Sequence, residues 1–171
     1  MIFETDRLIA RQLQESDQSA YFDMMGNPNV MCLIPREIMS KNESDKHLTK
    51  FIKNYDIHTN PTVWAIELKA ENEFIGLCGF LKNNENDDEI GYRLREKYWG
   101  VGYGTEITKG LIDFGFNHLN TDLITADVYV DNLRSVKILE KFFKREIEFF
   151  NTDDKCTDRR YKLTRKEWLS H

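Results

Sequence analysis

The sequence has few of the residues that metal sites and disulfide scaffolds require. It has three cysteines and four histidines: Cys32, Cys78, Cys156, His47, His58, His118 and His171. The cysteines form no C-x-x-C pair, and an odd number does not suit a disulfide framework. No two histidines stand four residues apart, the spacing at which one helix presents two metal ligands. We therefore expect reduced, mostly structural cysteines, no metal, and a reaction that needs none.

Long apolar runs and an excess of positive charge are also missing. The longest apolar run, residues 74–81, is far shorter than the roughly 18 residues of a membrane span. Charges at Glu4, Asp6 and Arg7 stand where a secretory signal would carry its apolar core, so we expect a cytoplasmic protein that does not bind a membrane. The 24 basic residues against 29 acidic ones disfavour nucleic acid and suit an amine-bearing partner.

What is present indicates one mixed domain. A length of 171 residues corresponds to about one domain, so a single domain over residues 1–171 is expected. Hydrophobic periodicity predicts strands at 7–13, 62–68, 74–81, 89–94, 123–130 and 159–164. It predicts four helices. The first starts at Ser16-Asp17 and is broken at Asn27-Pro28-Asn29, and the second is capped by Ser44 and ends before Asn60-Pro61. The third covers residues 105–118, and the fourth is capped by Asp131 or Asn132. The acidic segment 82–88 lacks the ligand spacing of a calcium loop and is interpreted as a solvated hairpin loop.

Three glycines between a strand and a helix are the strongest local signal. Gly100, Gly102 and Gly104 allow several backbone N–H groups to converge, unshielded, at the positive end of the helix. Such a loop binds phosphate or pyrophosphate, and a tight turn without a ligand is the other interpretation.

Two nucleotide classes fit this loop poorly. A dinucleotide fingerprint would need glycine where the chain has Thr105, although Asp131 could imitate its ribose-binding acid. That fold also opens with its glycine loop, whereas here at least four predicted strands precede it. A P-loop is disfavoured because no Gly-Lys-Ser or Gly-Lys-Thr occurs. The remaining ligand is a pyrophosphate whose reactive group lies at the end of a long arm, as in coenzyme A.

Two segments carry a specific resemblance. EIGYRL at 89–94 and YWGVGYGTE at 98–106 resemble the acetyl-coenzyme A motif of the GNAT superfamily of N-acetyltransferases, within it the RimJ/RimL-like branch that acetylates ribosomal-protein N-termini. Segments 5–9, 132–141 and 161–168 agree in order and spacing. The resemblance implies an α/β GNAT fold, a twisted mixed sheet of about six or seven strands with helices on both faces. It also implies a splay between the fourth and fifth strands that admits the cofactor.

The resemblance also implies the cofactor-binding residues. The backbone of residues 99–105 would hold the pyrophosphate, the strand edge at 92–94 would pair with the pantetheine arm, and Asn132 would hydrogen-bond that arm or simply cap its helix. The full set is Tyr92, Arg93, Leu94, Trp99, Gly100, Val101, Gly102, Tyr103, Gly104, Thr105, Asn132 and Ser135.

Three groups are candidates for the chemistry. Glu89, where relatives often have a glutamate facing the acceptor, is the candidate general base that deprotonates the amine. A backbone N–H near Leu94 would stabilise the oxyanion. Many relatives protonate the thiolate with a tyrosine where this chain has Leu139, which leaves Ser135 or water. Phe143-Lys144 replaces the family's Gly-Phe and is expected to alter the exit of that helix.

The sequence therefore predicts acetyl transfer from acetyl-coenzyme A to a primary amine by direct attack in a ternary complex. The acceptor would enter between the first two helices and the central strands. It would be a protein N-terminus or a small-molecule amine such as a polyamine, an aminoglycoside or an amino-acid derivative. A noncatalytic acyl-coenzyme A binding module is the main alternative, and a dinucleotide-dependent oxidoreductase is a weaker one. The oligomeric state does not follow from the sequence, and a homodimer is compatible with it.

Overall fold

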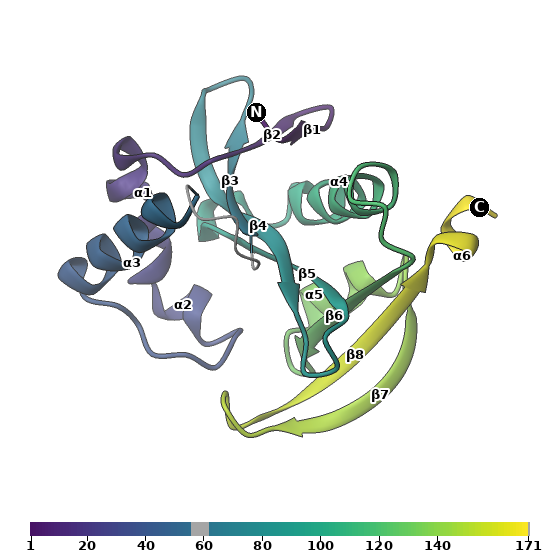
Figure 1. Ribbon diagram of the computed structural model, residues 1–171. Coiled ribbons are helices and arrows are strands. Elements are labelled where there is room, and N and C mark those ends of the chain that lie inside the picture. The colour runs from purple at the N-terminus through teal and green to yellow at the C-terminus, as the bar shows by residue number, and fades with distance from the viewer. Residues whose placement is uncertain (56–61, 171) are drawn as a thin grey trace.

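Strand-forming segments along the whole chain join into one sheet. The computed structural model describes residues 1–55 and 62–170. The strand order is β1-β2-β3-β4-β5-β6-β8-β7, and every neighbouring pair is antiparallel except β5 and β6 (Figure 1). The strands are β1 (Phe3–Glu4), β2 (Leu8–Arg11), β3 (Thr62–Leu68), β4 (Glu73–Lys82), β5 (Asp88–Leu94), β6 (Leu123–Tyr129), β7 (Lys144–Asn151) and β8 (Cys156–Thr164).

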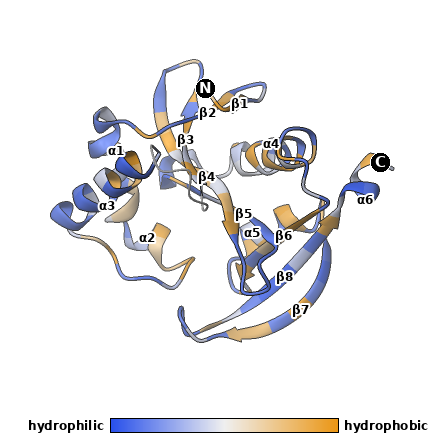
Figure 2. Ribbon diagram, in the orientation of Figure 1, coloured by the Kyte–Doolittle hydropathy of each residue, from blue (hydrophilic) through white to orange (hydrophobic). Residues whose placement is uncertain are grey.

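Helices cover both faces of this sheet because the central strands are buried on both sides. In β3, Trp64 and Ile66 pack into the core that includes α4, and Ala65 between them faces the core that includes α1 and α3. The helices are α1 (Gln18–Met25), α2 (Pro28–Met31), α3 (Lys41–Asn54), α4 (Tyr103–Asn117), α5 (Leu133–Leu139) and α6 (Arg165–Leu169). Figure 2 shows hydrophilic and hydrophobic residues alternating along α4, as expected of a helix with one buried face. The α/β fold expected from the sequence is confirmed.

The start of α3 differs from the prediction. The helix is capped by Ser40, whose hydroxyl accepts a hydrogen bond from the Glu43 backbone N–H while the Glu43 carboxylate accepts one from the Ser40 N–H. Ser44 instead lies inside the helix, fully buried, and its hydroxyl has no partner among the described residues. The prediction of a Ser44 cap was wrong because both serines precede the apolar periodic positions. Asn60 and Pro61, expected to follow the end of this helix, lie outside the described residues.

The break after α1 also starts a new helix. Asn27 accepts a hydrogen bond from the Asn29 N–H at 2.9 Å, and Pro28 occupies the first position of α2. This short helix leads into the segment Leu33–Arg36, which the functional site uses. A sequence reading that treats Asn-Pro-Asn only as a breaker misses it.

The strand that follows α5 has no periodic signal. Most residues of β7 are exposed because it is the outer strand of the sheet, so alternation of apolar residues is absent. Its register to β8 shifts between Arg145 and Ile147, shortly after the Phe143-Lys144 exit that replaces the family's Gly-Phe.

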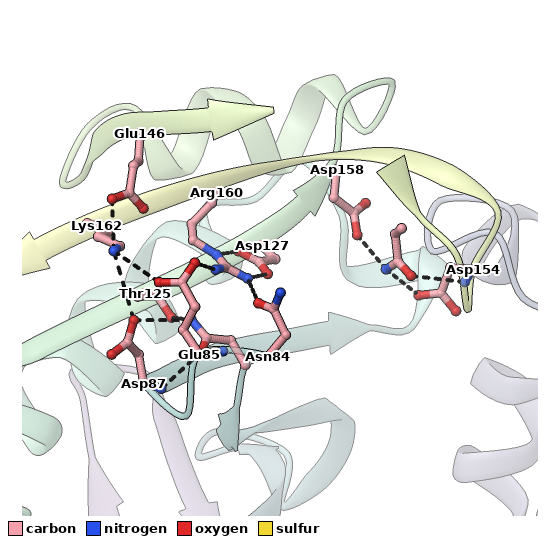
Figure 3. Close-up of polar contacts among 12 residues, drawn as sticks. Asn84, Glu85, Asp87, Thr125, Asp127, Glu146, Asp154, Asp158, Arg160 and Lys162 are labelled. Atoms are coloured by element: carbon pink, nitrogen blue, oxygen red, sulfur yellow. Dashed lines mark hydrogen bonds and ion pairs between the residues drawn. The ribbon is translucent and has the colours of Figure 1, made fainter. Parts of the chain in front are cut away.

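The acidic hairpin loop is held in place and is not simply solvated. Figure 3 shows Arg160 of β8 between Asp127, Glu85 and Asn84, with nitrogen–oxygen distances of 2.6–2.8 Å. Lys162 lies 3.6 Å from Glu85 and 3.9 Å from Asp87, so the loop between β4 and β5 is tied to β8. The hairpin itself is as predicted, and no group of three potential metal ligands occurs among residues 1–55 and 62–170.

The sheet opens between β5 and β6. Only Asp88 and Glu89 pair with β6, through Ile124 and Thr125, and from Ile90 onward the two strands diverge. These strands are the fourth and fifth of those predicted from the sequence, so the expected splay is confirmed. In the part of the chain that the structure describes, no helix is long and apolar enough to cross a membrane. The three cysteines are free; Cys78 and Cys156 are buried and Cys32 is exposed.

Candidate active site

The glycine loop lies directly before α4 and has the backbone of an anion-binding turn. Gly100 and Gly102 have φ values of 79° and 90°, a left-handed region that favours glycine. Gly102 caps α4, so the first N–H groups of this 15-residue helix have no partners within the helix. The helix dipole adds partial positive charge at the same point. The loop therefore fits a pyrophosphate.

Two N-terminal residues hold the loop in position. The Glu106 carboxylate accepts hydrogen bonds from the Thr5 hydroxyl (2.6 Å), the Arg7 N–H (2.7 Å) and the Arg7 Nε (2.6 Å). The Arg7 guanidinium also donates to the Val101 carbonyl at 3.1 Å and lies 4.4 Å from the centre of the Tyr103 ring. These contacts give a structural reason for the resemblance of segment 5–9, which is far from the loop in sequence.

A cavity of about 350 Å³ lies beside the loop, between β5 and α5. Ten of the twelve predicted cofactor-binding residues line it: Tyr92, Arg93, Leu94, Trp99, Gly100, Gly102, Gly104, Thr105, Asn132 and Ser135. Val101 and Tyr103 do not, because the Val101 side chain is exposed and the Tyr103 ring lies against Arg7. These two residues contribute only backbone to the loop.

Two basic residues at this cavity were missed from the sequence. Arg134 and Lys137 of α5 line it, and the Arg134 guanidinium lies 5.0 Å from the centre of the Trp99 ring. Cations beside an anion-binding loop fit a ligand with several phosphate charges. Their spacing of three residues places them on one helix face, a signal that would have been visible once Asn132 was taken as the helix cap.

The splayed edge of β5 presents free backbone groups to the cavity. The Arg95 N–H donates to the Ile75 carbonyl at 2.9 Å, which assigns the odd-numbered residues of β5 to hydrogen bonds with β4. By alternation, the N–H groups of Tyr92 and Leu94 point toward the gap that β6 leaves. The Leu94 carbonyl already accepts a hydrogen bond from the Trp99 indole N–H at 3.0 Å.

A second cavity, of about 540 Å³, adjoins the first along the same edge. It is bounded by β5, β6, the segment Leu33–Arg36 and the loop between β7 and β8. The two cavities share six wall residues: Leu33, Ile34, Tyr92, Arg93, Asn132 and Ser135. A reactive group held at one cavity therefore faces the contents of the other.

Glu89 lines the second cavity and is held in an unusual environment. No hydrogen bond or ion pair joins its carboxylate to another described residue. Burial, together with the negative charge of Asp127 and Asp158, raises its pKa to about 7 against the opposing effect of Arg160. Asp127 is neutralised in part by its two hydrogen bonds from Arg160 (Figure 3). At neutral pH, Glu89 is poised to accept a proton.

The start of α5 brings two polar groups to the shared wall, and β5 adds the Tyr92 hydroxyl. The Asn132 side chain accepts a hydrogen bond from the Ser135 N–H at 3.3 Å, so it does cap the helix, and its Nδ2 donates to the Leu33 carbonyl at 3.4 Å. The Ser135 hydroxyl lies 3.3 Å from the Tyr92 hydroxyl. Burial raises the pKa of Tyr92, which keeps this phenol protonated at neutral pH. Leu139, where many relatives carry a tyrosine, is buried.

Comparisons with known proteins agree with this geometry. The family model described as an acetyltransferase (GNAT) domain matches residues 7–142. The chain is 31% identical over 148 residues to the uncharacterized N-acetyltransferase YoaA of Bacillus subtilis, covering 85% of this chain and 84% of that protein. Its fold is similar to that of the ribosomal-protein α-N-acetyltransferase RimL in complex with coenzyme A (TM-score 0.77, 20% identity, 97% and 98% of the two chains). It is also similar to that of the spermidine N-acetyltransferase of Vibrio cholerae in complex with coenzyme A and spermine (TM-score 0.76, 23% identity, 95% and 98%).

Proposed function

The chain belongs to the acetyltransferase (GNAT) domain family, and from this premise we propose that it transfers an acetyl group from acetyl-coenzyme A to a primary amine by direct attack in a ternary complex. One observation carries the proposal. The anion-binding cavity and the cavity of Glu89 share a wall at the point where β5 and β6 part. Two ligands bound in these cavities would meet there without a covalent enzyme intermediate.

The first cavity suits acetyl-coenzyme A, which supplies an activated acetyl thioester when bound. The loop N–H groups from Gly100 to the first turn of α4, with Arg134 and Lys137, would hold the pyrophosphate. The Tyr92 N–H at the splayed edge would bind a carbonyl oxygen of the arm, and the Leu94 N–H would bind the oxygen of the thioester. This chain contains every residue that these contacts to acetyl-coenzyme A require.

Proton transfer is assigned to residues on both sides of the shared wall. Glu89, with a pKa of about 7, would take the proton from the ammonium group of the acceptor, directly or through water. The Leu94 N–H would donate to the oxygen that gains negative charge. Ser135 would give a proton to the departing thiolate, and the Tyr92 hydroxyl, 3.3 Å from the Ser135 hydroxyl, would serve as the next proton source.

The class of acceptor remains part of the proposal. RimL acts on a ribosomal protein and the Vibrio cholerae enzyme on spermidine, so the fold accommodates both a protein N-terminus and a small amine. The segment Leu33–Arg36 and the loop between β7 and β8 bound the second cavity of this chain. We favour a small-molecule amine over a folded protein terminus because these two segments and Glu89 line one cavity of about 540 Å³.

A thiol-release screen with amines and short N-terminal peptides tests this function. Gly91 lies on the cavity face of β5, and a Cβ at this position would meet no atom within 4 Å. We expect Gly91→Leu to fill the acceptor cavity, lower turnover strongly and leave acetyl-coenzyme A binding unchanged. No thiol release with any amine, despite acetyl-coenzyme A binding, would instead indicate a noncatalytic binding module.

A further inference from the structure

Arg93 shares one face of β5 with Glu89, and the two charges indicate which chemical groups the acceptor carries. Side chains alternate along a strand, so Glu89, Gly91 and Arg93 face the same side, and the outer two are about 13 Å apart between their Cα atoms. Gly91 leaves the strand face between them open. Both charged residues line the second cavity, and Arg93 also lines the first.

The Arg93 guanidinium has no anionic partner among the described residues. Its Nη1 contacts the sulfur atoms of Met25 and Met31 at 2.9 and 3.6 Å, and its Nε is buried without a hydrogen bond. Burial lowers its pKa to about 10, so the group stays charged at neutral pH. Asp154, the acid whose charge acts on it, is already 3.1 Å from Arg36.

This arrangement differs from that of the other arginines that are not exposed. Each of them lies within 4.0 Å of at least one carboxylate: Arg11, Arg95, Arg159, Arg160 and Arg165. A buried guanidinium without an anion is costly, and proteins retain such a group where a ligand supplies the anion. The unsatisfied donor of Arg93 at a cavity wall therefore points to an anionic group of the acceptor.

The pairing of the basic residues around the second cavity distinguishes Arg93 from the others. Five acids line it: Glu89, Asp127, Asp153, Asp154 and Asp158. Four bases line it: Lys82, Arg36, Arg93 and Arg160. Lys82, Arg36 and Arg160 are each paired with a carboxylate, whereas Arg93 is not. A polyamine would leave Arg93 unpaired and place further positive charge near it.

We propose that the acceptor is a zwitterion, a small amine that also carries a carboxylate, with the carboxylate bound by Arg93 and the amine facing Glu89. Amino acids and their derivatives have this chemistry. The inference rests on the acetyl transfer proposed above. In the reaction the amine nitrogen forms a bond to the acetyl carbon while the carbon–sulfur bond breaks. The nitrogen loses two protons, one to Glu89 and one that replaces the proton Ser135 gives to the thiolate, and the carboxylate of the acceptor is unchanged.

Matched acceptors test this assignment. Thiol release is measured for a panel of amino acids, each paired with its primary carboxamide, and for spermidine. We expect wild-type kcat/KM to favour the best carboxylate over its amide by about a hundredfold, the range expected when a buried charge loses its partner. Arg93→Met should remove most of this preference by raising KM for the carboxylate, and Arg93→Lys should restore part of it. Three results would overturn the proposal. They are equal kcat/KM for an amino acid and its carboxamide, a preference for spermidine, and an equal loss of kcat/KM for the amino acid and its carboxamide in Arg93→Met.

A binding experiment separates this proposal from the acetyl transfer itself. Methionine matches the length of the Arg93 stem and the sulfur-rich surroundings, so Arg93→Met should fold. The N-acetylated amino acid should raise the Tm of the wild type but not of Arg93→Met, and its amide should raise neither. This result would support the carboxylate site even if no amine were acetylated. The assignment would be overturned if the N-acetylated amino acid raised the Tm of neither the wild type nor Arg93→Met, or raised both by the same amount.

Discussion

At the scale of single residues, the candidate site contains charges that the fold does not neutralise. Glu89 has no hydrogen bond or ion pair to another described residue, and Arg93 has no carboxylate partner among them. Both positions are costly for the folded state. Residues that reduce stability in this way are common at sites that bind ligands, because the ligand supplies the missing partner.

The first prediction concerns the stability cost of Glu89. Its pKa is raised from 4.5 to about 7 on folding, so between these values the unfolded chain has lost a proton that the folded chain retains. The contribution of Glu89 to the free energy of unfolding therefore falls as pH rises through this window. Glu89→Gln should be more stable than the wild type by up to about 3 kcal/mol at pH 8, and the difference should vanish near pH 4.

Denaturant unfolding of the two proteins at several pH values measures this difference. The same variant should lose about a hundredfold or more in turnover at neutral pH, and a higher pH should restore part of the rate because more of the amine is then neutral. A pH-independent stability difference would show that Glu89 is not buried as described. Near wild-type turnover from pH 6 to 9 would assign the base elsewhere.

The second prediction concerns the hydroxyl pair at the shared wall. Ser135→Ala should lower kcat, because the variant lacks the proposed proton donor but keeps the Asn132 cap, which uses the backbone of residue 135. Tyr92→Phe should lower kcat less, since Ser135 keeps its own proton. Single-turnover thiol release measures both. A larger loss in Tyr92→Phe than in Ser135→Ala would identify the tyrosine as the direct donor.

At the scale of elements, two local features set the structure: the backbone conformation of the glycine loop and the side chains that cap the helix starts. The loop depends on backbone conformation and therefore on the absence of side chains. The helix starts depend on which polar residue lies at the boundary. Each gives a prediction with a control in the same segment.

The third prediction concerns the loop. Gly102 has a φ of 90°, and Gly102→Val should force this backbone out of the left-handed region and place a branched side chain beside the pyrophosphate. We expect acetyl-coenzyme A affinity to drop at least about tenfold, or about 1.4 kcal/mol. Val101→Ala, at the exposed neighbouring position, is the control and should bind normally. Calorimetry on folded variants decides, and unchanged affinity in Gly102→Val would place the phosphates elsewhere.

The fourth prediction concerns the start of α3. Ser40→Ala removes a cap that the Glu43 side chain completes and should destabilise the protein by about 1 kcal/mol. Ser44→Ala removes a buried hydroxyl that has no partner among the described residues and should be neutral or stabilising. Urea unfolding measures the free energy of unfolding of both variants. The opposite ranking would mean that the helix starts at Ser44, as its sequence first suggests.

At the scale of the whole molecule, one parallel strand pair in an otherwise antiparallel sheet creates the site. The strands β5 and β6 pair at two positions and then separate, and α4, α5 and the segment Leu33–Arg36 contribute residues to both cavities at this opening. Ligands that fill this opening bind only the folded chain. They should therefore stabilise it as a unit.

The fifth prediction follows from this coupling. Acetyl-coenzyme A at a hundred times its Kd should stabilise the protein by about 2.7 kcal/mol and raise its Tm, because it binds only the folded state. NAD should not, since the loop lacks the third glycine of the dinucleotide fingerprint at Thr105. Thermal shift measurements with both ligands test this. Equal stabilisation by NAD would contradict the assignment of the loop.

The sequence by itself determined the features that depend on neighbouring residues. The spacing of apolar residues predicted the central strands and α4, and the glycines at 100, 102 and 104 predicted the tight turn before α4, because periodicity and backbone freedom are local properties. The motifs around them indicated the family. The outer strand β7 had no such signal, since an exposed edge strand needs no alternation.

Only the tertiary structure decided which groups meet across the sheet. Tyr92 and Ser135 are 43 residues apart in the chain, yet their hydroxyls lie 3.3 Å apart. The pKa of Glu89 depends on Asp127, Asp158 and Arg160 of other strands, and the missing partner of Arg93 becomes visible only when its surroundings are in place. Burial and electrostatic energies depend on distances through space, which the packing of the helices and the opening between β5 and β6 set.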